Sequence, residues 1–193
     1  MLVPTYATVL LSIQLDKLNT GFIPNRWYCI FVIGTFLLTF IIPFTAMLLF
    51  WRGDISRAYM SERHSRNIPY AYSIVSAVLW YFFLRKVLCM PPIICTIAIG
   101  AIVSLFLIAL INLRWKISAH LTMLGALLGA ALAYGYYTGF FAYWTWLGIL
   151  LVSWIVMWAR LYLNEHTEIQ VVVGYLTGLI VTFTIGLTGA MLL

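Results

Sequence analysis

Charged residues are scarce in this chain. Aspartate, glutamate, lysine and arginine make up only 8% of its 193 residues, and only five side chains are acidic, whereas 64% are hydrophobic and the mean hydropathy is +1.04. Soluble globular domains carry about a quarter charged residues. The scarcity of charge excludes an ordinary soluble domain and predicts an integral membrane protein.

Linkers and polar domains are also missing. The longest polar stretch covers only residues 52–67, and no low-complexity segment divides the chain. The first residues lack the basic cluster and the small-residue cleavage pattern of a secretory signal peptide. We therefore expect one transmembrane domain over residues 1–193, with its N-terminal segment retained.

Disulfide and metal-ligand patterns are absent from the sequence as well. The chain has an odd number of cysteines, so no complete disulfide framework can form; they are Cys29, Cys89 and Cys95. No His-x-x-x-His or Glu-x-x-His spacing occurs. A metal-dependent hydrolase built from the histidines with Glu62, Glu165 or Glu168 is therefore only a minor alternative.

Long apolar runs fill most of the chain. A helix needs about 20 apolar residues to cross a hydrocarbon core of about 30 Å. Six runs approach or reach this length, at residues 27–51, 68–88, 92–113, 119–138, 141–159 and 169–193, and the shorter run 2–15 is a marginal seventh. Backbone polar groups must be satisfied within lipid, and the alternating segments of a barrel do not occur. The sequence therefore predicts an all-α, polytopic transmembrane helical bundle with six to seven spans.

Small residues recur every four positions in two of these spans. Gly125, Gly129 and Ala133 do so in the run 119–138, and Gly174 and Gly178 do so in the run 169–193. Small residues let two transmembrane helices approach closely. We interpret these glycines as structural and expect them to mark helix-packing seams.

Three polar breaks interrupt the apolar runs, and they hold the three histidines, His64, His120 and His166. Ionisable residues are costly in a membrane protein and mark candidate functional sites. Two predicted spans separate His64 from His120, and two more separate His120 from His166. Because an even number of crossings returns the chain to the same side, the three breaks are predicted to share one face of the membrane.

The second break places Lys116, Ser118 and His120 just before a span. In an extended approach, their alternation puts them on one face. Ser118 also stands where it can cap the next helix, whose N-terminal N–H groups suit a phosphate. The alternative is that Ser118 only caps the helix and that Lys116 only reaches the headgroups.

The third break has Arg160 six residues before His166, and the first has Arg63 and Arg66 three residues apart. An arginine fork binds two phosphoryl oxygens, and a neutral imidazole is a competent nucleophile toward phosphorus. Residues three apart on a helical turn point the same way, so Arg63 and Arg66 form a candidate anion site. The alternatives are an interfacial anchor, a polar loop histidine and a basic loop that binds headgroups.

The second and third breaks resemble two signature motifs of the type 2 phosphatidic acid phosphatase superfamily. Ser118 and His120 stand in Ile-Ser-Ala-His, where the family has Pro-Ser-Gly-His. Arg160, His166 and Gln170 have the spacing of the family's Ser-Arg, five residues, His, three residues and Asp. The resemblance extends over about residues 57–178.

The first break resembles the remaining family motif only loosely. Arg63, Arg66 and Pro69 echo its arginine and proline, without the lysine at its usual spacing. The resemblance as a whole implies a six-helix membrane core, no metal, no cofactor and a phosphohistidine intermediate. It also implies that His166 attacks phosphorus and that His120 protonates the leaving alkoxide. The implied phosphate-binding residues are Arg63, Arg66, Ser118 and Arg160, with Lys116 assisting.

Gln170 replaces the aspartate that orients the nucleophile in the family. An amide oxygen accepts the ring N–H without supplying charge, so reduced activity is expected, and Gln170→Asp should raise turnover or shift its pH optimum. Residues 167–170 also fit a helix capping box, in which Gln170 returns to the backbone. Glu165 and Glu168 remain candidates to replace the aspartate, although neither has its spacing.

The leading interpretation is a membrane-embedded phosphatase that hydrolyses a lipid phosphate monoester or diphosphate. A non-catalytic or weakly active protein that binds or transports lipid phosphates on the same scaffold is the alternative. The net charge of +6 is spread thinly over short loops, which favours membrane lipids over nucleic acid as partners. The sequence leaves the oligomeric state open.

The side of the membrane on which the breaks lie is predicted differently by two arguments. The face with the three breaks carries seven basic residues against four opposite, and the positive-inside rule would place it in the cytoplasm. Several of these charges are candidate phosphate ligands, and the resemblance implies a site facing the periplasm or exterior of a bacterial inner membrane. We expect the second arrangement.

Overall fold

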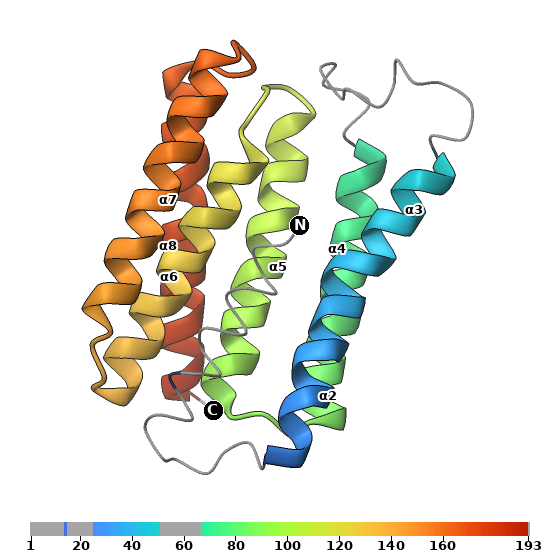
Figure 1. The fold of residues 1–193 in the computed structure, drawn as a ribbon, viewed down its shortest axis with the longest axis vertical. Coiled ribbons are helices and arrows are strands. Elements are labelled where there is room, and N and C mark those ends of the chain that lie inside the picture. The colour runs from blue at the N-terminus through green and yellow to red at the C-terminus, as the bar shows by residue number, and fades with distance from the viewer. Residues whose placement is uncertain (1–13, 15–24, 51–66, 193) are drawn as a thin grey trace.

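A computed structural model describes Gln14, residues 25–50 and residues 67–192 of the chain, and no strand occurs among them (Figure 1). The described part is built from α-helices and two π-helical turns, η1 and η4. Their bounds are α2 Asn25–Phe36, η1 Leu37–Ile41, α3 Ile42–Phe50, α4 Asn67–Phe82, η4 Phe83–Val87, α5 Pro92–Asn112, α6 Ala119–Thr138, α7 Tyr143–Tyr162 and α8 Glu168–Leu192.

Six helical segments in the described part are long and apolar enough to cross a membrane. They are Trp27–Thr45, Ile68–Val87, Pro92–Asn112, Ala119–Thr138, Tyr143–Tyr162 and Glu168–Leu192. This confirms the all-α class and fits an integral membrane protein with the six expected spans. The marginal run 2–15 lies outside the described residues except for Gln14. The prediction for the run 141–159 ended too early, because α7 continues past it and includes Arg160 in its last turn.

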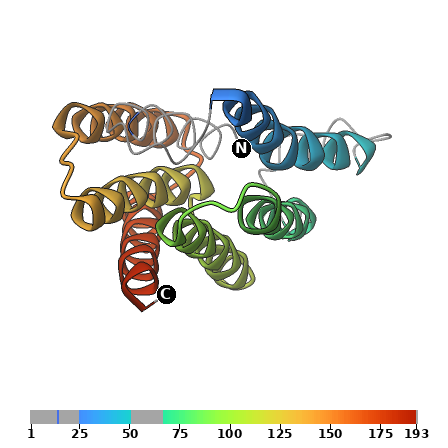
Figure 2. The same cartoon turned by 90° about the horizontal axis from the view of Figure 1, so that it is seen from below.

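The helices are not arranged in simple chain order. Consecutive α7 and α8 make little contact, because α6 lies between them (Figure 2). Helix α8 packs most extensively against α6 and then against α5, while α4 lies between α5 and the segment formed by α2, η1 and α3. The beginnings of α6 and α8 lie against each other at one end of the bundle, and both carry residues of the predicted site.

Helices α6 and α8 approach each other most closely at Gly125, Gly129, Gly174 and Gly178, which we call the α6–α8 seam. At each of these glycines an added Cβ would meet the backbone of the other helix. A Cβ on Gly129 would lie 3.0 Å from the amide nitrogen of Phe183, and it would lie closer still to the carbonyl oxygen of Leu179. A Cβ on Gly174 would lie 2.9 Å from the carbonyl oxygen of Ser118. Side chains at these positions would push the two backbones apart, so the prediction that these glycines mark a packing seam is confirmed.

Helix α8 is also joined to α5 by hydroxyl groups in the bundle interior. Thr96 donates a hydrogen bond to the carbonyl oxygen of Gly186 at 2.9 Å, and the hydroxyls of Ser104 and Thr182 lie 3.2 Å apart. The side chains of Thr96, Ser104 and Thr182 are buried. These contacts fix α8 from a second side, so its N-terminal end has a defined position relative to α6.

Candidate functional site

Ser118 occupies the N-cap position of α6 but does not cap it. Its backbone is extended, with φ −84° and ψ 101°, and its side chain makes no hydrogen bond to the first turn. The residue is fully buried, and its hydroxyl oxygen has no hydrogen-bond partner among the described residues. A buried hydroxyl without a partner is costly unless something else binds it. The interpretation of Ser118 as a capping residue only is therefore wrong.

The backbone N–H and the carbonyl oxygen of Ser118 are both hydrogen-bonded. Its N–H donates to the carbonyl oxygen of Gln170 at 3.4 Å, which joins the start of α6 to the start of α8. Its carbonyl oxygen accepts from the N–H of Thr122 at 3.0 Å and from the hydroxyl of Thr122 at 2.9 Å. With the backbone groups engaged, the buried hydroxyl is the only polar group of Ser118 that has no partner among the described residues.

Arg160 and His120 come together although 40 positions separate them in the sequence. A guanidinium nitrogen of Arg160 lies 2.8 Å from Nε2 of His120. Arginine can only donate, so Nε2 accepts this hydrogen bond. In the structure, therefore, the last turn of α7 and the first turn of α6 place one cation and one imidazole side by side.

Gln170 contacts both His166 and the start of α8. Its Oε1 lies 3.1 Å from Nδ1 of His166 and accepts a hydrogen bond from the N–H of Thr167 at 3.3 Å. The N–H of Gln170 in turn donates to the hydroxyl of Thr167 at 3.5 Å. The two roles considered for Gln170, orienting the histidine and completing a capping box, thus occur together.

The loop between α7 and α8 turns back at Asn164, which has a φ of 52°. Asparagine tolerates this left-handed conformation better than most residues and commonly ends helices in this way. The N–H of Glu165 then donates to the carbonyl oxygen of Arg160 at 3.2 Å. This turn brings the residue just before His166 back to the backbone of Arg160, and His166 itself is buried.

Lys116 forms an ion pair with Glu165 at 3.5 Å, and both side chains are about a quarter to a third exposed. The expectation that Lys116, Ser118 and His120 share one face of an extended approach is wrong. His120 already lies in α6, where it is exposed and contacts Arg160, while Ser118 is buried. Glu165 is thus paired with a lysine in the structure, and Gln170 is the residue that meets Nδ1 of His166.

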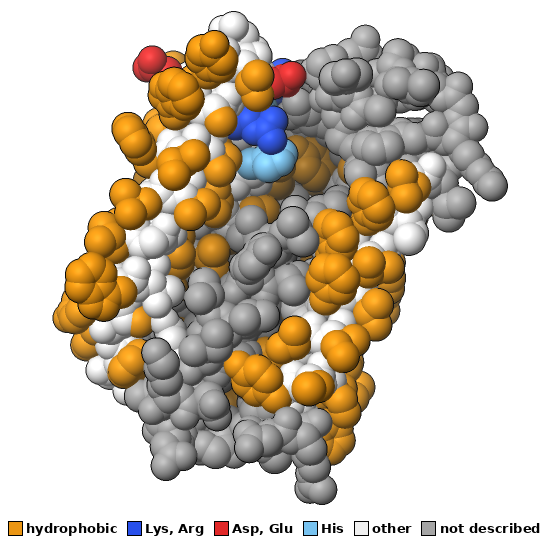
Figure 3. All heavy atoms as spheres, in the orientation of Figure 1, with side chains coloured by type: hydrophobic (Ala, Val, Ile, Leu, Met, Phe, Trp, Pro, Cys, Tyr) orange, Lys and Arg blue, Asp and Glu red, His pale blue; other side chains and the backbone are white. Residues whose placement is uncertain are grey.

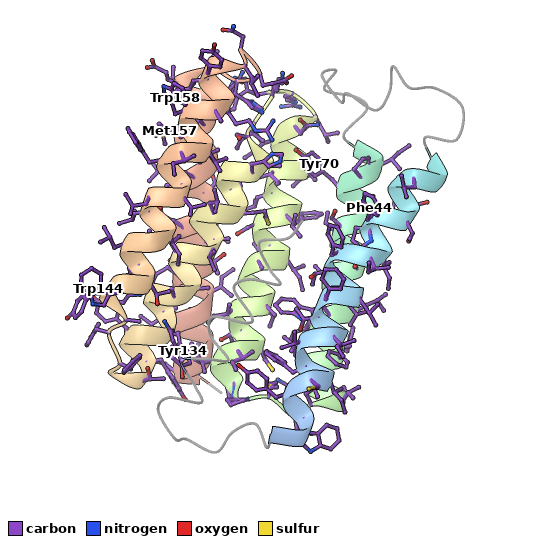
Figure 4. All side chains as sticks on the ribbon, in the orientation of Figure 1. Phe44, Tyr70, Tyr134, Trp144, Met157 and Trp158 are labelled. Atoms are coloured by element: carbon purple, nitrogen blue, oxygen red, sulfur yellow. The ribbon has the colours of Figure 1, made fainter. Side chains whose placement is uncertain are left out.

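The second and third breaks therefore meet at one end of the bundle, as their span parity predicts. Basic and histidine side chains gather at this end, while hydrophobic side chains cover the described surface along the helices (Figure 3). Tyr70 and Trp158 lie toward the same end, and Tyr134 and Trp144 toward the other (Figure 4). The first break, with Arg63, His64 and Arg66, lies outside the described residues.

One residue that supports the site was missed in the sequence. Thr122 binds the carbonyl oxygen of Ser118, and Gly174, already predicted to mark a packing seam, leaves no room for a Cβ beside the same oxygen. The four-residue spacing from Ser118 to Thr122 was the available signal, since a threonine hydroxyl can bond to the carbonyl one turn earlier. The spacing alone could not show that α8 would press on this turn.

Among the residues that the structure describes, no three histidine, cysteine, aspartate or glutamate side chains gather as metal ligands. Comparisons with family models, with curated proteins and with solved structures find no match to this chain. The site must therefore be interpreted from its own geometry and chemistry.

Proposed function

We propose that the chain is a membrane-embedded phosphatase that hydrolyses a lipid phosphate monoester or diphosphate through a phosphohistidine intermediate. The observation that carries the proposal is the 2.8 Å contact between Arg160 and His120, which joins the second and third breaks. A cation, two imidazoles and a buried hydroxyl then lie on neighbouring segments at one end of an apolar bundle. A lipid offers its phosphate at that level of the membrane while its tail stays in the bilayer.

The phosphate is bound by groups of three kinds. Ser118 offers a buried hydroxyl without a described partner at the N-terminal end of α6, where the helix dipole favours an anion. The planar guanidinium group of Arg160 can donate hydrogen bonds to two phosphoryl oxygens at once. Lys116 adds a positive charge at the exposed edge, and we include Arg63 and Arg66 of the first break in this set. Such donors stabilise the charge that spreads over the phosphoryl oxygens during transfer.

The reaction proceeds in two displacements. In the first, Nε2 of His166 forms a bond to phosphorus, and the bond from phosphorus to the lipid oxygen breaks. The lipid oxygen takes the electron pair and receives a proton from His120, so a lipid alcohol leaves, or a lipid monophosphate when the substrate is a diphosphate. In the second, water attacks phosphorus, the P–N bond breaks, and His120 accepts a proton from that water. Inorganic phosphate then leaves.

Arg160 changes partners in this scheme. In the structure it donates to Nε2 of His120, so that nitrogen carries no proton. When a phosphate draws the guanidinium away, Nε2 takes up a proton from water or from the bound phosphate monoanion, and His120 later passes this proton to the leaving oxygen. Substrate binding thereby prepares the acid.

A phosphate-release assay on purified protein in nanodiscs tests the proposal. Phosphatidic acid, phosphatidylglycerophosphate and an isoprenyl diphosphate are offered with a chelator present. We expect release from at least one substrate, its loss in His166→Ala, and its retention in the control Glu168→Gln, which changes an exposed residue two positions away. Labelling with ³²P should give a phosphoenzyme that is labile in acid and stable in alkali. Release that persists in His166→Ala would refute the mechanism.

One observation favours the second candidate, a protein that binds or transports lipid phosphates with little catalysis. Gln170 completes a capping box and supplies no negative charge to His166. The same nanodiscs separate the two candidates, because a binding protein would retain labelled phosphatidic acid without releasing phosphate.

We further propose that the site faces the periplasm or exterior of a bacterial inner membrane. Helix α8 begins beside the site and ends at the opposite end of the bundle (Figure 1). A tag placed after Leu193 should therefore lie on the cytoplasmic side. Cleavage of this tag by protease added outside intact spheroplasts would reverse the assignment.

A further inference from the structure

We infer that η1 is a hinge in the first described membrane span and that Ser76 of α4 locks it. The lock is a hydrogen bond from the hydroxyl of Ser76 to the carbonyl oxygen of Leu38. Pro43 makes this bond necessary, because it takes away a backbone donor that the carbonyl oxygen would otherwise have. The device is independent of the proposed function. It fixes the direction of α3, from which the chain passes into the first break.

Pro43 removes a hydrogen-bond donor from the interior of this span, two positions after η1 ends. The carbonyl oxygen of Leu38 would accept from residue 42 in an α-helix and from residue 43 in a π-helical turn. The N–H of Ile42 donates to the carbonyl oxygen of Leu37 instead. Pro43 has no N–H. No donor of its own helix is therefore left for the carbonyl oxygen of Leu38.

Ser76 supplies the missing donor from a neighbouring helix. A backbone carbonyl without a partner is costly in lipid, because no water is there to bind it. The hydroxyl of Ser76, which is buried, donates to the carbonyl oxygen of Leu38. One helical turn further along α4, Nε1 of Trp80 donates to the hydroxyl of Thr35 at 3.0 Å. Two hydrogen bonds thus join α4 to the end of α2 and to η1.

The span changes direction where these groups lie. Helix α3 leans away from the direction of α2 (Figure 1). Proline and π-helical turns are usual causes of a sharp helix bend. The hydroxyl of Thr39 also donates to the carbonyl oxygen of Thr35 at 2.7 Å, a contact that bends helices further. Since Trp80 holds the end of α2 on α4, the bond from Ser76 is what selects one angle for α3.

The test is a double-mutant cycle between Ser76→Ala and Pro43→Ala. Alanine at position 43 restores an N–H, so the carbonyl oxygen of Leu38 regains a donor in its own helix. Ser76 then has no carbonyl to rescue. Ser153→Ala is the matched control, because the buried hydroxyl of Ser153 donates to a carbonyl of its own helix, that of Ile149.

Unfolding by SDS titration in mixed micelles gives the first readout. Ser76→Ala should lower the SDS fraction at the unfolding midpoint, and by more than Ser153→Ala does. In the Pro43→Ala background, Ser76→Ala should leave the midpoint unchanged. If Ser76→Ala alone does not fold, the double variant decides, because it should fold as well as Pro43→Ala.

The angle of α3 gives the second readout. Spin labels at Ile30 in α2 and Leu48 in α3, both exposed, report the distance across the hinge by pulsed EPR. The native cysteines are first replaced by alanine; they are Cys29, Cys89 and Cys95. We expect one narrow distance distribution in the otherwise unchanged chain and a broad one in Ser76→Ala. In Pro43→Ala the mean distance should move toward that of a straight helix, about 27 Å along its axis.

Two outcomes would overturn the inference. One is an equal shift of the midpoint by Ser76→Ala in the two backgrounds, which would make Ser76 an ordinary packing residue. The other is a distance distribution in Ser76→Ala as narrow as in the parent chain, which would mean that η1 keeps its angle without the lock. Neither readout requires phosphatase activity, so the proposed function and the hinge stand or fall separately.

Discussion

Replacing Gly178 by alanine is expected to open the α6–α8 seam. The added Cβ would lie 2.7 Å from the amide nitrogen of Ala126 and closer still to the carbonyl oxygen of Thr122. Both atoms belong to the backbone of α6, so no change of side-chain rotamer relieves the contact. The two helices must separate, and the hydrogen bond between Ser118 and Gln170 crosses the same helix pair about two turns closer to the start of α8.

The size of the effect follows from two opposing contributions. Overpacking of a well-packed interior costs about 1–3 kcal/mol, and separation of backbones lies at the upper end of this range. Alanine in place of glycine favours a helix by up to about 1 kcal/mol. The free energy of unfolding should therefore fall by about 1–2 kcal/mol. Gly148→Ala in α7 is the matched control, because a Cβ there meets nothing within 4 Å, and its free energy of unfolding should stay constant or rise.

Unfolding by SDS titration in mixed micelles measures the free energies of the two variants side by side. Binding of orthovanadate, an analogue of the phosphoryl group in transfer, reports on the site in the same samples. Gly178→Ala should unfold earlier than Gly148→Ala and bind vanadate more weakly. Equal unfolding curves for the two alanine variants would refute the close seam, and the positioning of Ser118 by α8 would lose its basis.

Two further predictions concern Ser118 and Arg160, the proposed phosphate ligands. Ser118→Ala should weaken orthovanadate binding by about tenfold or more, the usual effect of losing one hydrogen bond to a charged group. Its free energy of unfolding should stay the same or rise, because the buried hydroxyl has no described partner. A loss of stability equal to the loss of binding free energy would instead indicate a purely structural serine. Arg160→Lys should lower kcat/KM for lipid phosphate by about tenfold or more, because an ammonium lacks the planar fork, and steady-state kinetics showing wild-type values would contradict Arg160 as a phosphate ligand.

The six helices were predictable because their signal is local. An apolar run of sufficient length in lipid can only be a helix, so Ala119–Thr138 and Pro92–Asn112 agree with the predicted runs within a residue. The end of α7 was not predictable in this way, since hydropathy falls at Arg160 although the helix continues to Tyr162. A single arginine in the last turn does not break a helix.

The candidate site was predictable only in part. Spacing and resemblance selected His120, Arg160 and His166, and span parity placed the second and third breaks on one face. The contact of Arg160 with His120 depends on how α7 crosses α6, which no local pattern specifies. That the Ser118 hydroxyl lacks a partner within the described part of the chain likewise could be seen only in the tertiary structure, because sequence preference alone favours serine as a cap.

The place of α6 between α7 and α8 has a consequence for biosynthesis. The segment that supplies His166 and Gln170 follows α7 in the chain, so it becomes available for packing after α7. Helix α8 must then reach the opposite side of α6 from α7 and close the seam at its glycines (Figure 2). The helices up to α7 can thus pack together while the candidate site is still incomplete, and assembly of that site waits for the docking of α8.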